Sequence, residues 1–150
     1  MIARTRIVVV GNGMVGQRFL EKLPAAHSYD ITVLCEEPRP AYDRVQLSSL
    51  FAGKSAEDLD LVPPGFFEAH GISVRLRERA MAIDTQARTV KTDTGDRIAY
   101  DKLILATGSQ PFVPPVPGRD RVGCHVYRTI EDLEAIRTSA AHARVGVVIG

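Results

Sequence analysis

The feature that most constrains the fold is an apolar run that ends in a glycine-rich turn near the N-terminus. The segment Arg6-Ile7-Val8-Val9-Val10 is β-branched and continuous, as expected of a strand covered on both faces in a parallel sheet. After Gly11-Asn12-Gly13, apolar residues at helical spacing predict a helix from Met14 to Leu23, which Pro24 closes. A second strand is predicted from Ile31 to Cys35. This order predicts a βαβ unit with a right-handed crossover.

The turn has the glycine spacing that is typical of dinucleotide-binding folds. Gly11 permits the tight turn, Gly13 lets the backbone approach a pyrophosphate, and Gly16 admits close packing of helix on strand. Glu36 lies about 20 residues further on, at the end of the second strand, where a carboxylate accepts both hydroxyl protons of an adenosine ribose. Its neighbour Glu37 would repel a ribose 2′-phosphate, which disfavours NADP at this site. A purely structural glycine turn and a solvated loop charge at Glu36 are the alternatives.

The rest of the chain continues the α/β pattern and adds an antiparallel meander. Short alternating segments with turn signals predict the meander from Ala80 to Ile98, and Lys102 to Ala106 is predicted as another buried strand, which ends in Thr107-Gly108. Two short helices, a strand and a longer helix are predicted at Asp43–Phe51, Pro63–His70, Ile72–Leu76 and Ile130–His142. The predicted fold is therefore α/β, a truncated Rossmann-like domain with a parallel sheet and a small antiparallel β-meander.

Composition and spacing disfavour several other classes of protein. The net charge is +1 with no block of either sign, so nucleic acid is not expected as a partner. No apolar run approaches the roughly 18 residues of a membrane span, and the N-terminus lacks a signal-peptide core, so we expect a cytoplasmic protein with no membrane partner. Neither the cysteines, Cys35 and Cys124, nor the histidines have metal-ligand spacing, so no metal is expected and both thiols are predicted to be reduced and buried.

Three segments together resemble the pyridine nucleotide-disulfide oxidoreductase superfamily of flavoproteins. They are Gly11 to Gly16, Tyr100 to Ser109 and Arg128 to Asp132, and the resemblance extends over essentially the whole chain. Within this group, Cys35 to Ser49 is most similar to the large subunits of NAD(P)H-dependent siroheme nitrite reductases. The resemblance implies FAD as the cofactor, and it implies that residues 1–144 are the N-terminal part of an FAD-binding domain.

The resemblance also implies roles for individual residues. Backbone groups of Gly13, Met14 and Val15 would contact the FAD pyrophosphate, and Glu36 would hold the adenosine ribose. The other implied FAD contacts are Arg44 to a phosphate or on the flavin side, the backbone of Ala80 to adenine, Ala106, Thr107 and Gly108 closing over the cofactor, and Arg128 nearby. The alternative for the two arginines is an ordinary surface or interface cation, and Ala80 also has a purely structural interpretation.

The sequence departs from the family pattern at several positions. Ser49 stands where relatives that serve ferredoxins and rubredoxins usually carry Lys, so one phosphate or flavin contact is missing or replaced there. Leu20 stands where Ala or Gly is frequent, which predicts slightly wider packing of helix on sheet. The chain lacks a CxxxxC pair, and Asp43 to Phe51 contains no cysteine, so thiol chemistry at the flavin is disfavoured.

The function implied is the FAD-binding portion of an NAD(P)H-dependent reductase that passes electrons from NAD(P)H through FAD to a downstream centre. A full-length relative would also bind NAD(P)H, and siroheme and an iron–sulfur cluster are further expectations. No residue is predicted as a catalytic acid, base or nucleophile. A ferredoxin- or rubredoxin-type reductase and a non-catalytic nucleotide-binding fragment are the alternatives, and the terminal acceptor and the choice of NADH or NADPH stay open.

The last six residues repeat the character of the first strand. Val145 to Gly150 is predicted as the first strand of a truncated NAD(P)-binding domain, which makes the chain a fragment that we expect to be inactive alone. An uncovered apolar strand is a template for pairing with another chain. We therefore expect this tail either to be disordered, or to dock on its own domain, or to dock on a neighbouring molecule and so give self-association.

Overall fold

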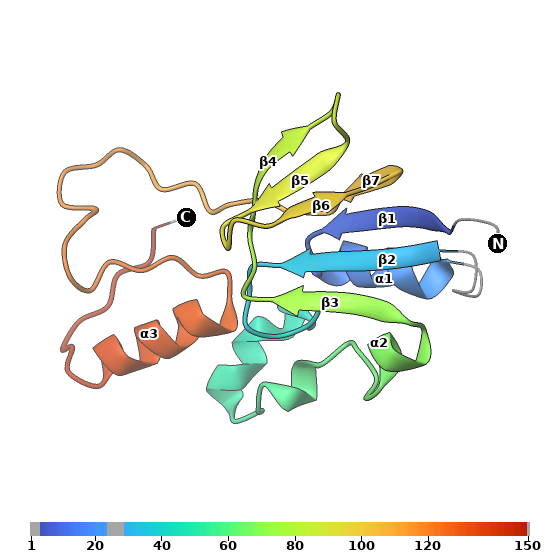
Figure 1. Ribbon diagram of the computed structural model, residues 1–150. Coiled ribbons are helices and arrows are strands. Elements are labelled where there is room, and N and C mark those ends of the chain that lie inside the picture. The colour runs from blue at the N-terminus through green and yellow to red at the C-terminus, as the bar shows by residue number, and fades with distance from the viewer. Residues whose placement is uncertain (1–3, 24–28, 150) are drawn as a thin grey trace. The chain divides into compact units, whose positions relative to one another are not determined.

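The computed structural model describes residues 4–23 and 29–149 and divides the chain into two compact units (Figure 1). The first unit contains Met1–Asp43 and Leu59–Gly108, and the second contains Arg44–Asp58 and Ser109–Gly150. Pro24, predicted to close the first helix, and Gly150, the last residue of the strand predicted at the C-terminus, lie outside the described residues.

A four-stranded parallel sheet forms the centre of the first unit, in the order β3-β2-β1-β7. The strands are β1 (Thr5–Val10), β2 (Tyr29–Cys35), β3 (Ile72–Leu76) and β7 (Lys102–Leu105). Helix α1 (Met14–Lys22) connects β1 to β2, which are parallel neighbours, so the predicted βαβ unit is confirmed. Because all four strands are parallel, their carboxyl ends lie along one edge of the sheet, as the arrowheads of β1, β2 and β3 show (Figure 1).

Strand β1 contributes to two hydrophobic clusters, which explains its uninterrupted apolar run. Ile7 and Val9 pack with Leu20 of α1 and with neighbouring strands, whereas Val8 and Val10 pack with Val90 and Tyr100. Successive side chains of a strand point to opposite faces, so burial of both faces requires apolar residues at every position. The larger side chain at position 20 is accommodated, since Leu20 is 2% exposed; the wider helix packing predicted for it stays a prediction.

The predicted meander is confirmed as the antiparallel sheet β4-β5-β6. Its strands are β4 (Ala80–Asp84), β5 (Thr89–Thr92) and β6 (Arg97–Ala99). The hydrophobic cluster that contains Val8 and Val10 also contains Val90 of this sheet, and Ile98 packs against it. The meander therefore covers the side of β1 that α1 does not.

The short helices differ from their predicted form. The segment after Asp43 is a 3-10 helix, η2 (Arg44–Ala52), and a further 3-10 turn, η3 (Glu57–Leu59), follows it. Only Phe66–Ala69 of the second predicted helix is helical (α2), because Gly65 just before it has a left-handed φ of 74°. The prediction placed Pro63 in the first turn of the helix, where proline is tolerated. In the structure, Pro63 and Pro64 both precede that turn.

The second unit contains η2 and the helix α3 (Ile130–Ala140). A capping box begins this helix: the Thr129 hydroxyl accepts from the backbone N–H of Asp132 at 3.1 Å, and the Asp132 carboxylate accepts from the backbone N–H of Thr129 at 2.9 Å. The strand predicted at Val145 to Ile149 is not formed, because no other strand of the described residues pairs with it. Its four large apolar side chains are more than three-quarters exposed, and the predicted self-association stays a prediction.

Asp101, directly before β7, fixes this edge strand to β1. Its Oδ2 atom accepts from the backbone N–H of Arg6 at 2.8 Å, and its Oδ1 atom accepts from the Arg6 guanidinium at 2.8 Å. The backbone N–H of Asp101 in turn donates to the Arg6 carbonyl at 2.9 Å. The side-chain hydrogen bond, followed by the backbone one, lowers the pKa of the Asp101 carboxyl from 3.8 to about 2.

We expect this contact to give a defined pH dependence of stability. The folded-state pKa of Asp101 is depressed, so its stabilisation is fully present above pH 3.8 and is lost as the pH falls towards about 2. In urea unfolding, the wild-type protein should exceed Asp101→Asn in free energy of unfolding above pH 4, and the difference should shrink towards pH 2. A difference that stays constant over this range would contradict the assignment.

Candidate nucleotide-binding site

The glycine turn lies at the carboxyl edge of the parallel sheet and is held by backbone contacts on both sides. Gly11 donates its N–H to the carbonyl of Leu34 in β2 at 2.8 Å, and Ala106 donates to the carbonyl of Val10 at 2.8 Å. Gly11 has a φ of +102°, a conformation that L side chains rarely adopt. A Cβ added there would lie 2.3 Å from the carbonyl oxygen of Ala106. The strand end after β7 therefore closes against the first glycine.

The three glycines of the motif have different surroundings. A Cβ on Gly16 would lie 2.3 Å from the carbonyl oxygen of Gly11, so the first and third glycines are required by close packing within the fold. A Cβ on Gly13 would meet no atom within 4 Å. Gly13 also has an extended backbone, with φ −90°, which other residues adopt. Neither packing nor backbone conformation requires a glycine there, whereas close approach of a ligand would.

The start of α1 is suited to an anion. Gly13 occupies the N-cap position and no side chain caps the helix. Backbone N–H groups in the first turn of a helix lack intrahelical partners, and the helix dipole favours negative charge there. Met14 and Val15 begin the helix and are exposed, Val15 at 73%. The open space at Gly13 and this uncapped turn fit the pyrophosphate of a dinucleotide.

Two buried amide side chains, neither of which was predicted from the sequence, support the turn from inside. Asn12 Oδ1 accepts from the backbone N–H of Ala41 at 3.0 Å, and Asn12 Nδ2 donates to Gln17 Oε1 at 3.4 Å. Asn12 is 5% exposed and Gln17 is 1% exposed. The available signal was one polar residue inside the motif and one directly after it, but Ala41, the backbone partner of Asn12, is distant in sequence. Together they join the glycine turn to the segment after β2.

The adjacent carboxylates Glu36 and Glu37 have different partners. Glu36 is exposed at the end of β2, and its Oε1 atom lies 3.6 Å from Arg79 Nη1. Glu37 Oε2 accepts from the Tyr42 hydroxyl at 2.9 Å, and its carbonyl accepts from the Arg77 N–H at 3.1 Å. Glu36 is thus the carboxylate with acceptor sites open to a ligand, while Glu37 fixes the loop and keeps its charge beside the site.

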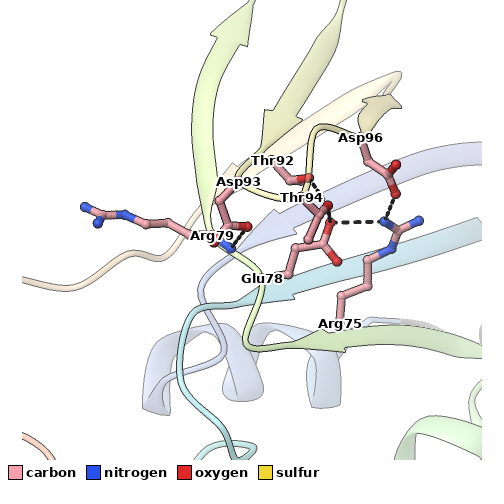
Figure 2. Close-up of polar contacts among 7 residues, drawn as sticks. All are labelled: Arg75, Glu78, Arg79, Thr92, Asp93, Thr94 and Asp96. Atoms are coloured by element: carbon pink, nitrogen blue, oxygen red, sulfur yellow. Dashed lines mark hydrogen bonds and ion pairs between the residues drawn. The ribbon is translucent and has the colours of Figure 1, made fainter.

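A polar network joins the end of β3 and the segment before β4 to the turn between β5 and β6 (Figure 2). Arg75 Nη1 donates to Glu78 Oε1 at 3.1 Å and to Asp96 Oδ2 at 2.8 Å. Thr94 also donates to Glu78 Oε1, at 3.2 Å, and its hydroxyl lies 2.8 Å from that of Thr92. The Glu78 carboxylate, in a residue that is 9% exposed, is therefore neutralised and hydrogen-bonded.

The remaining predicted residues of the first unit lie at strand ends. Ala80 begins β4, pairs with Thr92 and is half-buried. Ala106, Thr107 and Gly108 follow β7, and Gly108 has a left-handed φ of 69°. The structure thus brings the glycine turn and Ala106 into contact, and it places Glu36 at the same sheet edge.

The second unit holds the other three predicted residues. Arg44 Nη1 donates to the carbonyl of Arg128 at 3.2 Å, and Arg128 Nη1 donates to the Ser109 hydroxyl at 3.1 Å. The hydroxyl of Ser49 is buried, with no hydrogen-bond partner among the described residues. The structure thus brings Arg44 and Arg128 together and leaves Ser49 with an unsatisfied donor.

The sequence also led to predictions for the two cysteines and for metal ligands. Cys35 is buried, as predicted, and its Sγ lies 3.4 Å from the carbonyl of Arg39. The prediction for Cys124 is wrong, because this thiol is exposed in the proline-rich segment before α3, which builds no core around it. Within residues 4–23 and 29–149, no group of three His, Cys, Asp or Glu side chains could hold a metal ion. None of the helices described here has the length and apolar composition to cross a membrane.

Comparison with known proteins gives consistent matches. The family model for pyridine nucleotide-disulphide oxidoreductases matches residues 5–150. The chain is 51% identical over 152 residues to the large subunit of nitrite reductase (NADH) from Escherichia coli (strain K12), an alignment that covers 99% of this chain and 18% of the relative. It is 54% identical over 147 residues to the nitrite reductase [NAD(P)H] large subunit of Klebsiella oxytoca, covering 96% and 15%. The chain therefore spans less than a fifth of the length of these curated relatives.

Among solved structures, the fold is similar to that of NADH:rubredoxin oxidoreductase from Clostridium acetobutylicum. The TM-score is 0.75 at 28% identity, and the match covers 92% of this chain and 35% of that one.

Proposed function

Because the chain belongs to the pyridine nucleotide-disulphide oxidoreductase family, we propose that it is the FAD-binding portion of an NAD(P)H-dependent flavoprotein reductase of the nitrite reductase large-subunit type. The observation that carries FAD binding is the contrast among the motif glycines. Gly11 and Gly16 are required by the fold, whereas Gly13 faces open space at an uncapped helix start. Glu36 at the end of the next strand supplies the acceptor for a ribose.

Each part of the dinucleotide has proposed protein contacts. The backbone N–H groups of Gly13, Met14 and Val15 bind the pyrophosphate, and the Glu36 carboxylate accepts the ribose hydroxyl protons. The backbone at Ala80 faces the adenine, and Ala106 to Gly108 close over the cofactor. For Arg44, Ser49 and Arg128, a role in flavin binding rests on the family resemblance. When bound, FAD supplies the redox chemistry, taking a hydride from NAD(P)H and passing electrons on.

The electron acceptor of the whole protein is proposed from its relatives. Identities of 51% and 54% to nitrite reductase large subunits favour nitrite reduction, with siroheme and an iron–sulfur cluster as further centres in a cytoplasmic enzyme. A rubredoxin-type reductase is the second candidate, because the fold is also similar to NADH:rubredoxin oxidoreductase at 28% identity. Assay of the full-length protein with NADH or NADPH against nitrite and against rubredoxin separates these candidates.

The FAD assignment predicts a specific loss in Glu36→Gln. Replacing the carboxylate by an amide of similar shape removes charge-assisted acceptance from the ribose, so FAD binding should weaken by about 1.5–3 kcal/mol. Titration of the flavin-free, full-length protein with FAD, followed by flavin fluorescence, measures this change.

Glu37→Gln is the matched control for this experiment. It removes the same charge one residue away, from a carboxylate already bonded to Tyr42, and should weaken FAD binding much less. Equal losses in the two variants would indicate a general charge effect and count against the ribose contact. Failure of the wild-type protein to bind FAD would overturn the proposed function.

A further inference from the structure

We propose that Arg79 is a positioning residue for the adenosine half of the dinucleotide, acting through the carboxylate of Glu36. The inference rests on the proposed function. Arg79 Nη1 lies 3.6 Å from Glu36 Oε1, and both side chains are more than half exposed. An exposed ion pair of this kind contributes little to the stability of a fold. Since Glu36 is the proposed ribose acceptor, we infer that Arg79 acts in binding and not in stability.

The backbone on both sides of Arg79 is fixed. The N–H groups of the two preceding residues, Arg77 and Glu78, donate to the carbonyls of Glu37 and Cys35 at 3.1 and 3.0 Å. The Arg79 N–H donates to Asp93 Oδ1 at 3.0 Å, and the Asp93 N–H donates to the Arg79 carbonyl at 3.0 Å. The backbone that carries the Arg79 side chain is therefore held by hydrogen bonds, two of which join it directly to the segment that contains Glu36.

The Arg79 side chain lies outside the polar network that Arg75 forms with Glu78 and Asp96 (Figure 2). Figure 2 shows that Arg75 turns into the network, while the Arg79 side chain extends away from it. Arg75 is the cation that neutralises Glu78 and Asp96, and interaction with these carboxylates raises the pKa of its guanidinium. Arg79 is thus not the counter-charge of the buried carboxylate, and its ion pair is with Glu36.

The geometry of the pair leaves Glu36 able to bind a ribose. At 3.6 Å the contact is longer than a hydrogen bond, so it does not occupy the lone pairs of the carboxylate. An ionised carboxylate has about four acceptor sites, and two ribose hydroxyls require two of them. Water screens the pair in the free protein, and a bound adenosine would displace that water and strengthen the attraction. Arg79 should therefore hold the carboxylate in place more strongly in the complex.

The test compares FAD with FMN, which lacks the adenosine half, in the flavin-free, full-length protein. Arg79→Gln should weaken FAD binding about two- to fivefold, the scale of an exposed ion pair, and leave FMN binding unchanged. Arg79→Lys should restore most of the FAD affinity, because a single N–O contact needs the charge and not the planar fork of arginine. Arg97→Gln, which removes an exposed cation from the same meander, is the control and should change neither affinity.

The double variant Glu36→Gln/Arg79→Gln tests the route of action. If Arg79 acts through Glu36, the double variant binds FAD as Glu36→Gln does, because the second change has nothing left to position. Additive losses, unchanged or tighter FAD binding in Arg79→Gln, or equal losses for FAD and FMN would each overturn the inference. These results leave FAD binding by the wild-type protein intact, whereas its absence would overturn the proposed function and this inference with it.

Discussion

Gly11→Ala should lower the free energy of unfolding by about 3–5 kcal/mol, combining left-handed backbone strain with overpacking. The new methyl group would lie 2.3 Å from the Ala106 carbonyl oxygen, and the backbone at position 11 has a φ of +102°. The backbone cannot move apart easily at either residue, because Gly11 is hydrogen-bonded to β2 and Ala106 is hydrogen-bonded to β1. Urea unfolding of the variant and the wild-type protein without flavin measures the loss.

Gly13→Ala is the matched control for this stability measurement. Its methyl group meets nothing within 4 Å, and its extended backbone suits alanine. We expect a loss of less than about 1 kcal/mol, because alanine is a poorer helix N-cap than glycine. Equal destabilisation by the two substitutions would contradict the distinct roles assigned to the glycines.

The parts of the fold that were predictable are those in which local pattern and tertiary environment agree. The run from Ile7 to Val10 predicts a doubly covered strand because each face has its own cluster, and the capping box at Thr129 is specified within four residues. The segment from Pro63 to His70 was less predictable. Proline at a helix start is a general tendency, but the left-handed Gly65 delays the helix to Phe66.

The candidate site was predictable where it depends on spacing and not where it depends on contacts. The motif glycines and Glu36 have fixed positions along a βαβ unit, so their placement follows from the sequence. The partners of Asn12 and Arg79 lie far from them along the chain, in Ala41 and Glu36. The Asn12–Ala41 contact follows only from the pairing of β1 with β2, and the Arg79–Glu36 contact only from the pairing of β2 with β3.

The neighbouring acids show how the structure adds contacts to a distinction that spacing already makes. The distance from the glycine motif assigns the ribose to Glu36 and leaves Glu37 as an adjacent charge, but it does not give the partner of either side chain. Tyr42, five residues along the chain, donates its hydroxyl to Glu37 and leaves Glu36 facing Arg79 and solvent. The proposed ligand contact therefore depends on where one tyrosine packs, and Tyr42 is 1% exposed.

Gly13→Ala should weaken FAD binding about ten- to hundredfold while the fold stays intact, the scale of losing one charge-assisted hydrogen bond to the pyrophosphate. The added methyl group would stand in the open space where the backbone N–H groups of α1 must approach the anion. Met14→Ala is the control, because it shortens the adjacent side chain and keeps the backbone N–H, so it should bind FAD as the wild type does. Fluorescence titration with FAD measures both affinities. Undiminished binding by Gly13→Ala would mean that the pyrophosphate does not lie against this turn.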